Sequence, residues 1–158
     1  MNESPATTES NPTAERNKVF DYVRYPACWT EVESNIVDGF FNIKDLNIMF
    51  GVGPTANITN IFYLGDIIDW VKTAIPTNAQ GDATIIYINP AGAISQGSSM
   101  LMLERMNSQL KTSALDYLSS INDPVVEPII NKLKQSHAES NSWVEYLEKL
   151  DQLRGTNW

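Results

Sequence analysis

The chain has 158 residues, the length of one ordinary domain. Hydrophobic residues make up 42% and charged residues 19%, so the chain can bury a core and a wholly disordered chain is disfavoured. Its 11 basic residues against 19 acidic ones give a net charge of −8 and an isoelectric point near 4.5.

The composition also narrows the sites that the chain can form. A single cysteine, Cys28, excludes an internal disulfide and a multi-thiolate metal site, and a single histidine, His137, excludes a multi-histidine metal site. No apolar run approaches the roughly 20 residues of a membrane-spanning helix. An acidic chain without a basic stripe is a poor match for phosphate backbones. We therefore expect no nucleic-acid ligand, no membrane span, no metal and no cofactor.

The N-terminal segment differs in composition from the rest. Residues 1–17 are rich in Ser, Thr, Asn, Glu and Pro and contain no large apolar residue after Met1, so we expect a flexible polar arm followed by one globular helix-rich domain at 18–158. No basic region followed by an apolar region is present, and a secretory signal peptide is not predicted. We expect the protein in the cytoplasm or in an assembled particle, with signal-independent export as an alternative.

Helix signals begin inside this segment. Asn11-Pro12 resembles a cap and a first-turn proline, which predicts a short helix to about Arg24. Thr30 to Glu33 match a capping box, and apolar residues at helical spacing predict a helix that continues to Phe41. We expect Cys28, just before this helix, to be a small buried hydrophobe.

The middle of the chain predicts two short strands around a strongly apolar helix. Residues 58–75 are apolar on most of the helix circumference, so this helix is expected to be central or buried against another chain. Gly65 costs this helix about 1 kcal/mol relative to alanine, which indicates close approach by a neighbouring backbone. Strands are predicted near 46–52 and 84–88, and they make at most a small sheet or a hairpin.

The C-terminal part predicts helices only. Apolar residues recur at three- and four-residue steps over 100–121, close to a heptad pattern, and predict one long helix. Asn122-Asp123-Pro124 begins the next helix, and a capping box at Ser142 begins the last, which ends at Gly155. The predicted fold is mainly α with a minor β element (α+β) and a bundle-like C-terminal half.

Acidic residues are the candidates for chemistry. Asp66 and Asp69, three apart on one helix, place two carboxylates side by side, as general acid–base chemistry or a cation site requires. Glu31 and Glu33 extend this acidic patch on the preceding helix. A solvated acidic face has the same pattern, and we assign no catalytic residue.

Aromatic and apolar residues are the candidates for an interface. The apolar stripes of the middle and late helices exceed what so short a chain is expected to cover by itself. The interface candidates are Trp158, Trp70, Trp143, Phe62, Leu103, Met106 and Leu110.

These patterns favour a non-enzymatic interaction or assembly subunit, such as a structural component of a viral or secretory assembly. We expect a homo-oligomer or a subunit of a larger assembly. Two alternatives stay open. Residues 31–70 carry a net charge of −5, which suits a small acidic protein that neutralises a basic partner such as a toxin. The other alternative is a small carboxylate-dependent enzyme or ligand-binding protein with a cleft beside the 84–88 strand.

Overall fold

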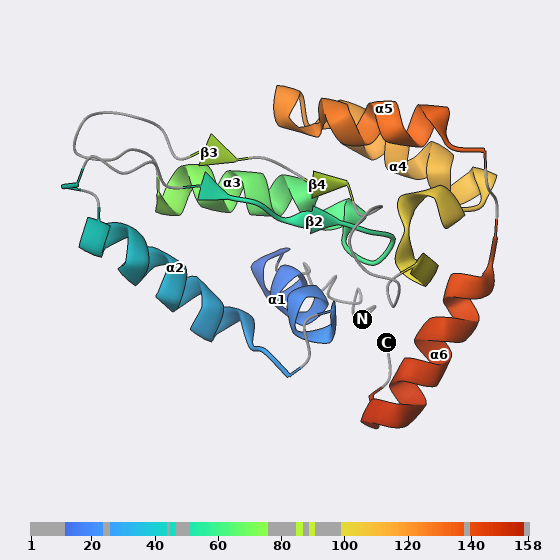
Figure 1. Ribbon diagram of the computed structural model, residues 1–158, viewed down its shortest axis with the longest axis horizontal. Helices are drawn as coiled ribbons and strands as arrows, with labels where there is room; N and C mark the ends of the chain where they lie inside the picture. The colour runs from blue at the N-terminus through green and yellow to red at the C-terminus, as the bar shows by residue number, and fades with distance from the viewer. Residues whose placement is uncertain are drawn as a thin grey trace, which may run out of the picture.

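The computed structural model describes residues 12–23, 26–43, 45–46, 51–75, 85–86, 89–90, 99–137 and 140–156. Within these ranges the chain is mostly helical with very short strands, which confirms the predicted mainly α class with a minor β element (Figure 1). Helix α1 (Pro12–Val23) begins at the expected proline. Residues 12–17 of the predicted arm therefore belong to this helix, and residues 1–11 lie outside the described residues.

Helix α2 (Trp29–Ile43) begins one residue before the predicted cap. The Trp29 N–H donates to the Asp21 carboxylate of α1 at 2.6 Å, so α1 satisfies an N–H at the start of α2. The expected Thr30–Glu33 capping box is therefore wrong, because the helix has already begun at Trp29. Cys28 is exposed rather than buried, with its sulfur 3.2 Å from the Thr30 hydroxyl.

Helix α3 (Leu64–Ala74) is central, as predicted, but it begins six residues after the predicted start at 58, and the 3₁₀ turn η1 (Ile61–Tyr63) precedes it. Its first half contributes Leu64 and Ile68 to a first core cluster. Its second half contributes Trp70 and Val71 to a second core cluster, together with Ile75 just beyond the helix and with Trp29 and Phe40 of α2. The remaining buried members of the first core cluster are Ala56, Ile58, Ile61, Leu103, Met106, Ala114, Leu118, Val126, Ile129 and Leu133. One helix therefore joins the two halves of the molecule.

The strands that precede α3 in the sequence pair with the strands that follow it. Strand β1 (Gly51–Val52) pairs with β3 (Ile85–Ile86), and β2 (Thr55–Ala56) pairs with β4 (Asn89–Pro90). Both pairs are parallel and keep the same offset of 34 residues between partners. Parallel strands need a crossover connection, and α3 lies within it. Strands β1 and β3 lie inside the predicted ranges 46–52 and 84–88, whereas β2 and β4 lie just beyond them. The hairpin alternative is excluded because hairpin strands are antiparallel.

The predicted continuous helix over 100–121 is wrong in its first third. Two 3₁₀ turns, η2 (Ser99–Leu101) and η3 (Leu103–Arg105), precede α4 (Ser108–Ser120). Met106 is extended, with φ −63° and ψ 138°, and the Asn107 side chain caps α4 by accepting from the Leu110 N–H at 2.8 Å. The 3₁₀ turns nevertheless direct Leu103 and Met106 into the core, which explains why the apolar spacing resembles a helix.

The last helices begin and end near the predicted positions, but the expected capping box at Ser142 is wrong, because Ser142 is already in α6 and the cap residue is Asn141, which makes no side-chain cap hydrogen bond. The 3₁₀ turn η4 (Pro124–Val126) leads into α5 (Glu127–Gln135), and α6 (Ser142–Arg154) ends at Gly155, whose φ of 65° is left-handed. Helices α4 and α5 pack against each other, while α6 contacts η2 and extends away from that pair (Figure 1).

Candidate functional site

The structure separates the two acidic residues of α2. Glu33 faces α3, where its carboxylate accepts a hydrogen bond from the indole N–H of Trp70 at 2.5 Å. Trp70 is buried, and a buried indole N–H needs an acceptor. Glu31 is exposed. Glu33 therefore joins α2 to α3, and Glu31 is available at the surface.

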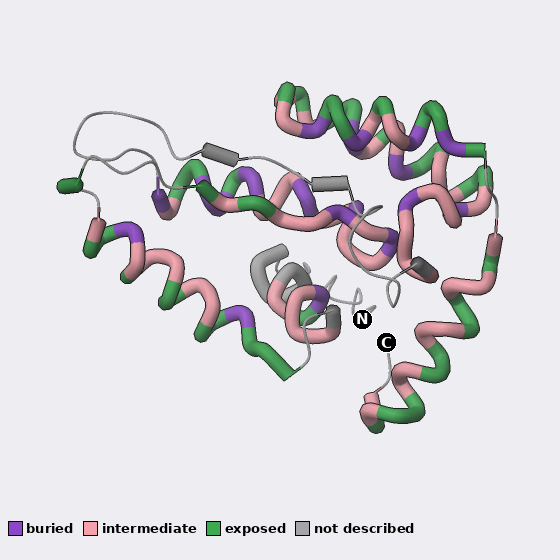
Figure 2. The backbone as a smooth tube through the Cα atoms, viewed as in Figure 1, coloured by how far each residue is buried: buried purple, intermediate pink, exposed green. Residues whose placement is uncertain are grey.

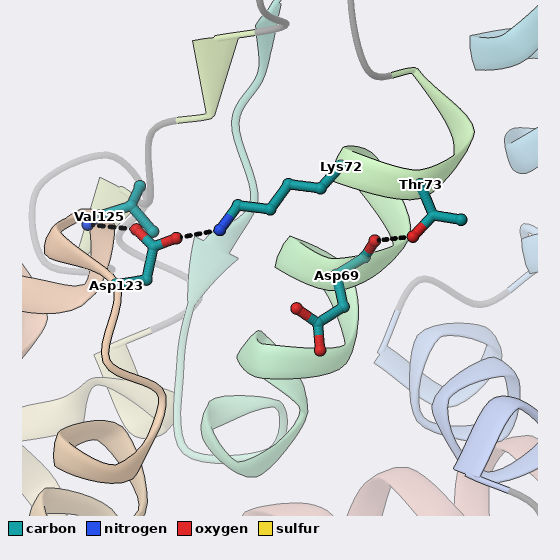
Figure 3. Close-up of polar contacts among 5 residues, drawn as sticks. All are labelled: Asp69, Lys72, Thr73, Asp123 and Val125. Atoms are coloured by element: carbon teal, nitrogen blue, oxygen red, sulfur yellow. Dashed lines mark hydrogen bonds and ion pairs between the residues drawn. The ribbon is translucent and has the colours of Figure 1, made fainter.

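The Asp69 carboxylate lies apart from the ion pair that Lys72 of α3 makes (Figure 3). The Asp69 side chain is exposed, and its backbone carbonyl accepts from the Thr73 hydroxyl at 2.7 Å. The neighbouring Lys72 forms an ion pair with Asp123, and Figure 3 shows the Asp69 carboxylate apart from that pair. Among the described residues, no group of three or more His, Cys, Asp or Glu side chains is arranged to hold a metal ion.

Asp123 instead joins α3 to the start of α5. The hydrogen bond from Lys72 lowers the pKa of the Asp123 carboxyl, and the Val125 N–H, which donates at 2.9 Å, lowers it further (Figure 3). An open hollow of about 260 Å³ lies beside it, lined by Leu118, Ser119, Asn122 and Glu127 among others. The lining of this hollow mixes polar residues, among them Ser119 and Glu127, with the apolar side chains of Leu118, Val126 and Ile130.

Gly65 marks a close approach, as the sequence predicts, but the neighbour is a side chain rather than backbone. The Gly65 N–H donates to the hydroxyl of Tyr117 in α4 at 3.2 Å. A Cβ atom at position 65 would lie 2.9 Å from that oxygen. Burial raises the pKa of the Tyr117 hydroxyl; the Gly65 N–H lowers it, and the charges of Asp66 and Asp69 raise it.

Most of the predicted interface residues serve the chain's own core. Trp70, Leu103 and Met106 are buried, so their surfaces are already covered by intrachain contacts. The other described candidates are half-buried and pack against the first core cluster; they are Phe62, Leu110 and Trp143. Trp158 lies outside the described residues. We expected a partner to cover these side chains, but Trp70, Leu103 and Met106 are covered within the chain, where α2, α3 and the 3₁₀ turns pack together. The side chains of Phe62, Leu110 and Trp143 stay partly exposed.

The apolar side chains left uncovered are different ones. Among the described residues, the large exposed hydrophobics are Phe41 (54% exposed), Leu46 (50%), Val144 (38%) and Leu153 (84%). The exposure of Phe41 is related to its position next to Phe40 in the sequence. Phe40 and Phe41 are adjacent on a helix, about 100° apart, and Phe40 is the one that faces the core.

Helix α6 is the least covered helix for which every residue is described. No residue between Ser142 and Arg154 is buried. The helix is held at both ends: Trp143 packs against the first core cluster, and the Arg154 guanidinium donates to the Tyr22 carbonyl of α1 at 2.7 Å. Burial raises the pKa of the Tyr22 hydroxyl, and the nearby Asp151 raises it further.

Comparison of the chain with protein-family models, with curated proteins and with solved structures finds no match. None of the helices described is long and apolar enough to cross a membrane. The functional interpretation therefore depends on the surface of this chain alone.

Proposed function

We propose that the protein is a non-enzymatic assembly subunit that associates with a second copy of itself through α6. The observation that carries this proposal is that α6 has no buried residue although six of its 13 residues are large and apolar. These residues are Trp143, Val144, Tyr146, Leu147, Leu150 and Leu153.

The spacing of these residues gives α6 an apolar side that the chain itself covers only in part. Tyr146, Leu147 and Leu150 lie on the same side of the helix as Trp143 and are only half-buried. Leu153 lies at the edge of that side and is 84% exposed. Each fully buried leucine stabilises a fold or an interface by about 1.5–3 kcal/mol relative to exposure, so this side of α6 gains from further cover.

The charges of α6 lie on the side opposite its apolar residues. Glu145, Glu148 and Lys149 are exposed there. Two-fold association brings the same patch of each subunit together, so the apolar sides of two α6 helices can meet while these charges stay in solvent.

Sedimentation velocity on the full chain at micromolar concentrations tests this proposal. We expect a discrete oligomer for the wild type and a shift to monomer for Leu153→Ser. The matched control is Gln152→Ser, a change at the exposed neighbouring position, which should sediment like the wild type. A wild type that is monomeric throughout the concentration range would contradict the proposal.

A further inference from the structure

The outer face of α2 is a second uncovered surface, and it differs in character from α6. Glu31, Ser34, Asp38 and Phe41 recur at the spacing that places residues on one side of a helix, and all four are exposed (Figure 2). The inner side of the same helix carries Trp29 and Phe40, which are buried in the second core cluster. We call the four exposed residues the outer α2 face.

An exposed aromatic ring lies at one end of this face. Phe41 is 54% exposed and contacts Phe40 edge-on, with 5.5 Å between ring centroids. Leu46, three residues after the helix ends, is 50% exposed. Aromatic residues, phenylalanine included, are enriched in protein interfaces relative to the rest of the surface, and a few well-packed residues there carry most of the binding energy.

The charge of this face is of one sign. Glu31 and Asp38 are exposed on it, with the Ser34 hydroxyl 3.4 Å from the Asp38 carboxylate, and Asp45 is exposed just beyond the helix. Lys44 is the only basic residue in the sequence between Tyr25 and Val71. Two copies of this face would repel each other, and nucleic acid and anionic membrane surfaces would be repelled as well.

We propose that the outer α2 face docks a basic protein surface, in which an apolar pocket receives Phe41 and surrounding Lys or Arg side chains meet Glu31 and Asp38. This proposal rests on the proposed function, because it names the partner class of an assembly subunit. It uses a different helix, however, so the two can fail separately. The mixed charges of α6 do not favour a basic partner, whereas the negative charges of the outer α2 face do.

The test uses the full chain and a fluorescent synthetic amphipathic helix of leucine and lysine as the probe, with fluorescence anisotropy as the readout. A peptide of the same composition without an apolar face, and a leucine–glutamate helix, are the probe controls. We expect the leucine–lysine helix to bind most tightly. Phe41→Ser and the double variant Glu31→Gln/Asp38→Asn should each weaken binding by about tenfold.

The matched protein control is Glu145→Gln/Glu148→Gln on α6. It removes the same number of negative charges as the α2 double variant, and Glu145 lies in the first turn of its helix as Glu31 does. If this control binds the leucine–lysine helix with an affinity within about twofold of the wild type, the result supports docking on α2. The proposal is overturned if this control weakens binding as much as the α2 variants, if Phe41→Ser binds like the wild type, or if the leucine–lysine helix does not bind.

The same samples separate this proposal from the proposed function. Phe41→Ser should leave self-association unchanged in the sedimentation measurement, and Leu153→Ser should leave binding of the leucine–lysine helix unchanged. Loss of peptide binding with Leu153→Ser would place the docking surface at α6 and would overturn the assignment to α2.

Discussion

Replacing Gly65 by alanine tests the contact that joins α3 to α4. The backbone at position 65 is helical, so alanine is favoured there by about 1 kcal/mol of helix propensity. The added Cβ atom, however, would lie 2.9 Å from the Tyr117 hydroxyl oxygen and 3.5 Å from a side-chain carbon of Ile121. The balance of these effects decides the sign of the change in stability.

The contact outweighs the propensity. Moving the Tyr117 hydroxyl away loses its hydrogen bond from the Gly65 N–H, worth about 0.5–1.5 kcal/mol. Repacking around an extra methyl group in a filled interior costs about 1–3 kcal/mol. Against the gain of about 1 kcal/mol from propensity, we expect Gly65→Ala to destabilise the protein by about 0.5–3.5 kcal/mol.

The assay is urea unfolding followed by far-ultraviolet circular dichroism, applied to a double-mutant cycle. Tyr117→Phe alone should cost about 1 kcal/mol, because it removes the hydroxyl that accepts from Gly65. With phenylalanine at position 117 the obstacle is gone, so adding Gly65→Ala should be neutral or stabilising. Equal costs of Gly65→Ala with tyrosine and with phenylalanine at position 117 would refute the reasoning.

Two further predictions concern the other contacts of α3. Glu33→Ala removes the acceptor of the buried Trp70 indole N–H and should cost about 1–3 kcal/mol of unfolding free energy, whereas Glu31→Ala should stay within about 0.5 kcal/mol; equal losses in urea unfolding would count against the assigned role of Glu33. Because Lys72 lowers the pKa of Asp123, their pair stabilises the fold above the ordinary carboxyl pKa of about 3.9, and that contribution is lost as the pH falls through the lower value of the folded state. Lys72→Met should therefore be less stable than the wild type near pH 7 in thermal unfolding, and the difference should shrink as the pH falls below about 3.9. A difference that is the same at every pH would disprove the linkage.

The sequence predicts helix ends well where a local signal decides them. Proline at position 12, the Asn122-Asp123-Pro124 break and Gly155 each act through their own backbone, so the structure matches these predictions. The start of α4 was missed because Leu103 and Met106 keep an apolar spacing that 3₁₀ turns and a helix share. Only the cap at Asn107 distinguishes 3₁₀ turns from a continuous α-helix here, and the apolar periodicity that predicts a helix continues across Asn107.

The site was harder to predict because it depends on which faces meet. Glu31 and Glu33 are two residues apart and lie on opposite sides of α2, so the helix itself separates a surface carboxylate from one that binds Trp70. The parallel pairing of the strands depends on α3 crossing between them, which no local signal specifies. Exposure of Phe41 follows once Phe40 is known to face the core, and that choice depends on where α2 packs.

Hydrogen exchange of the full chain at low and high protein concentration tests the central claim most directly. If α6 is where one copy meets another, amides of Ser142–Arg154 should exchange more slowly at the higher concentration. Those of α4, which carries the fully buried Ala114 and Leu118, should not change. Exchange of α6 that is independent of concentration, or slowing confined to other helices, would contradict the account.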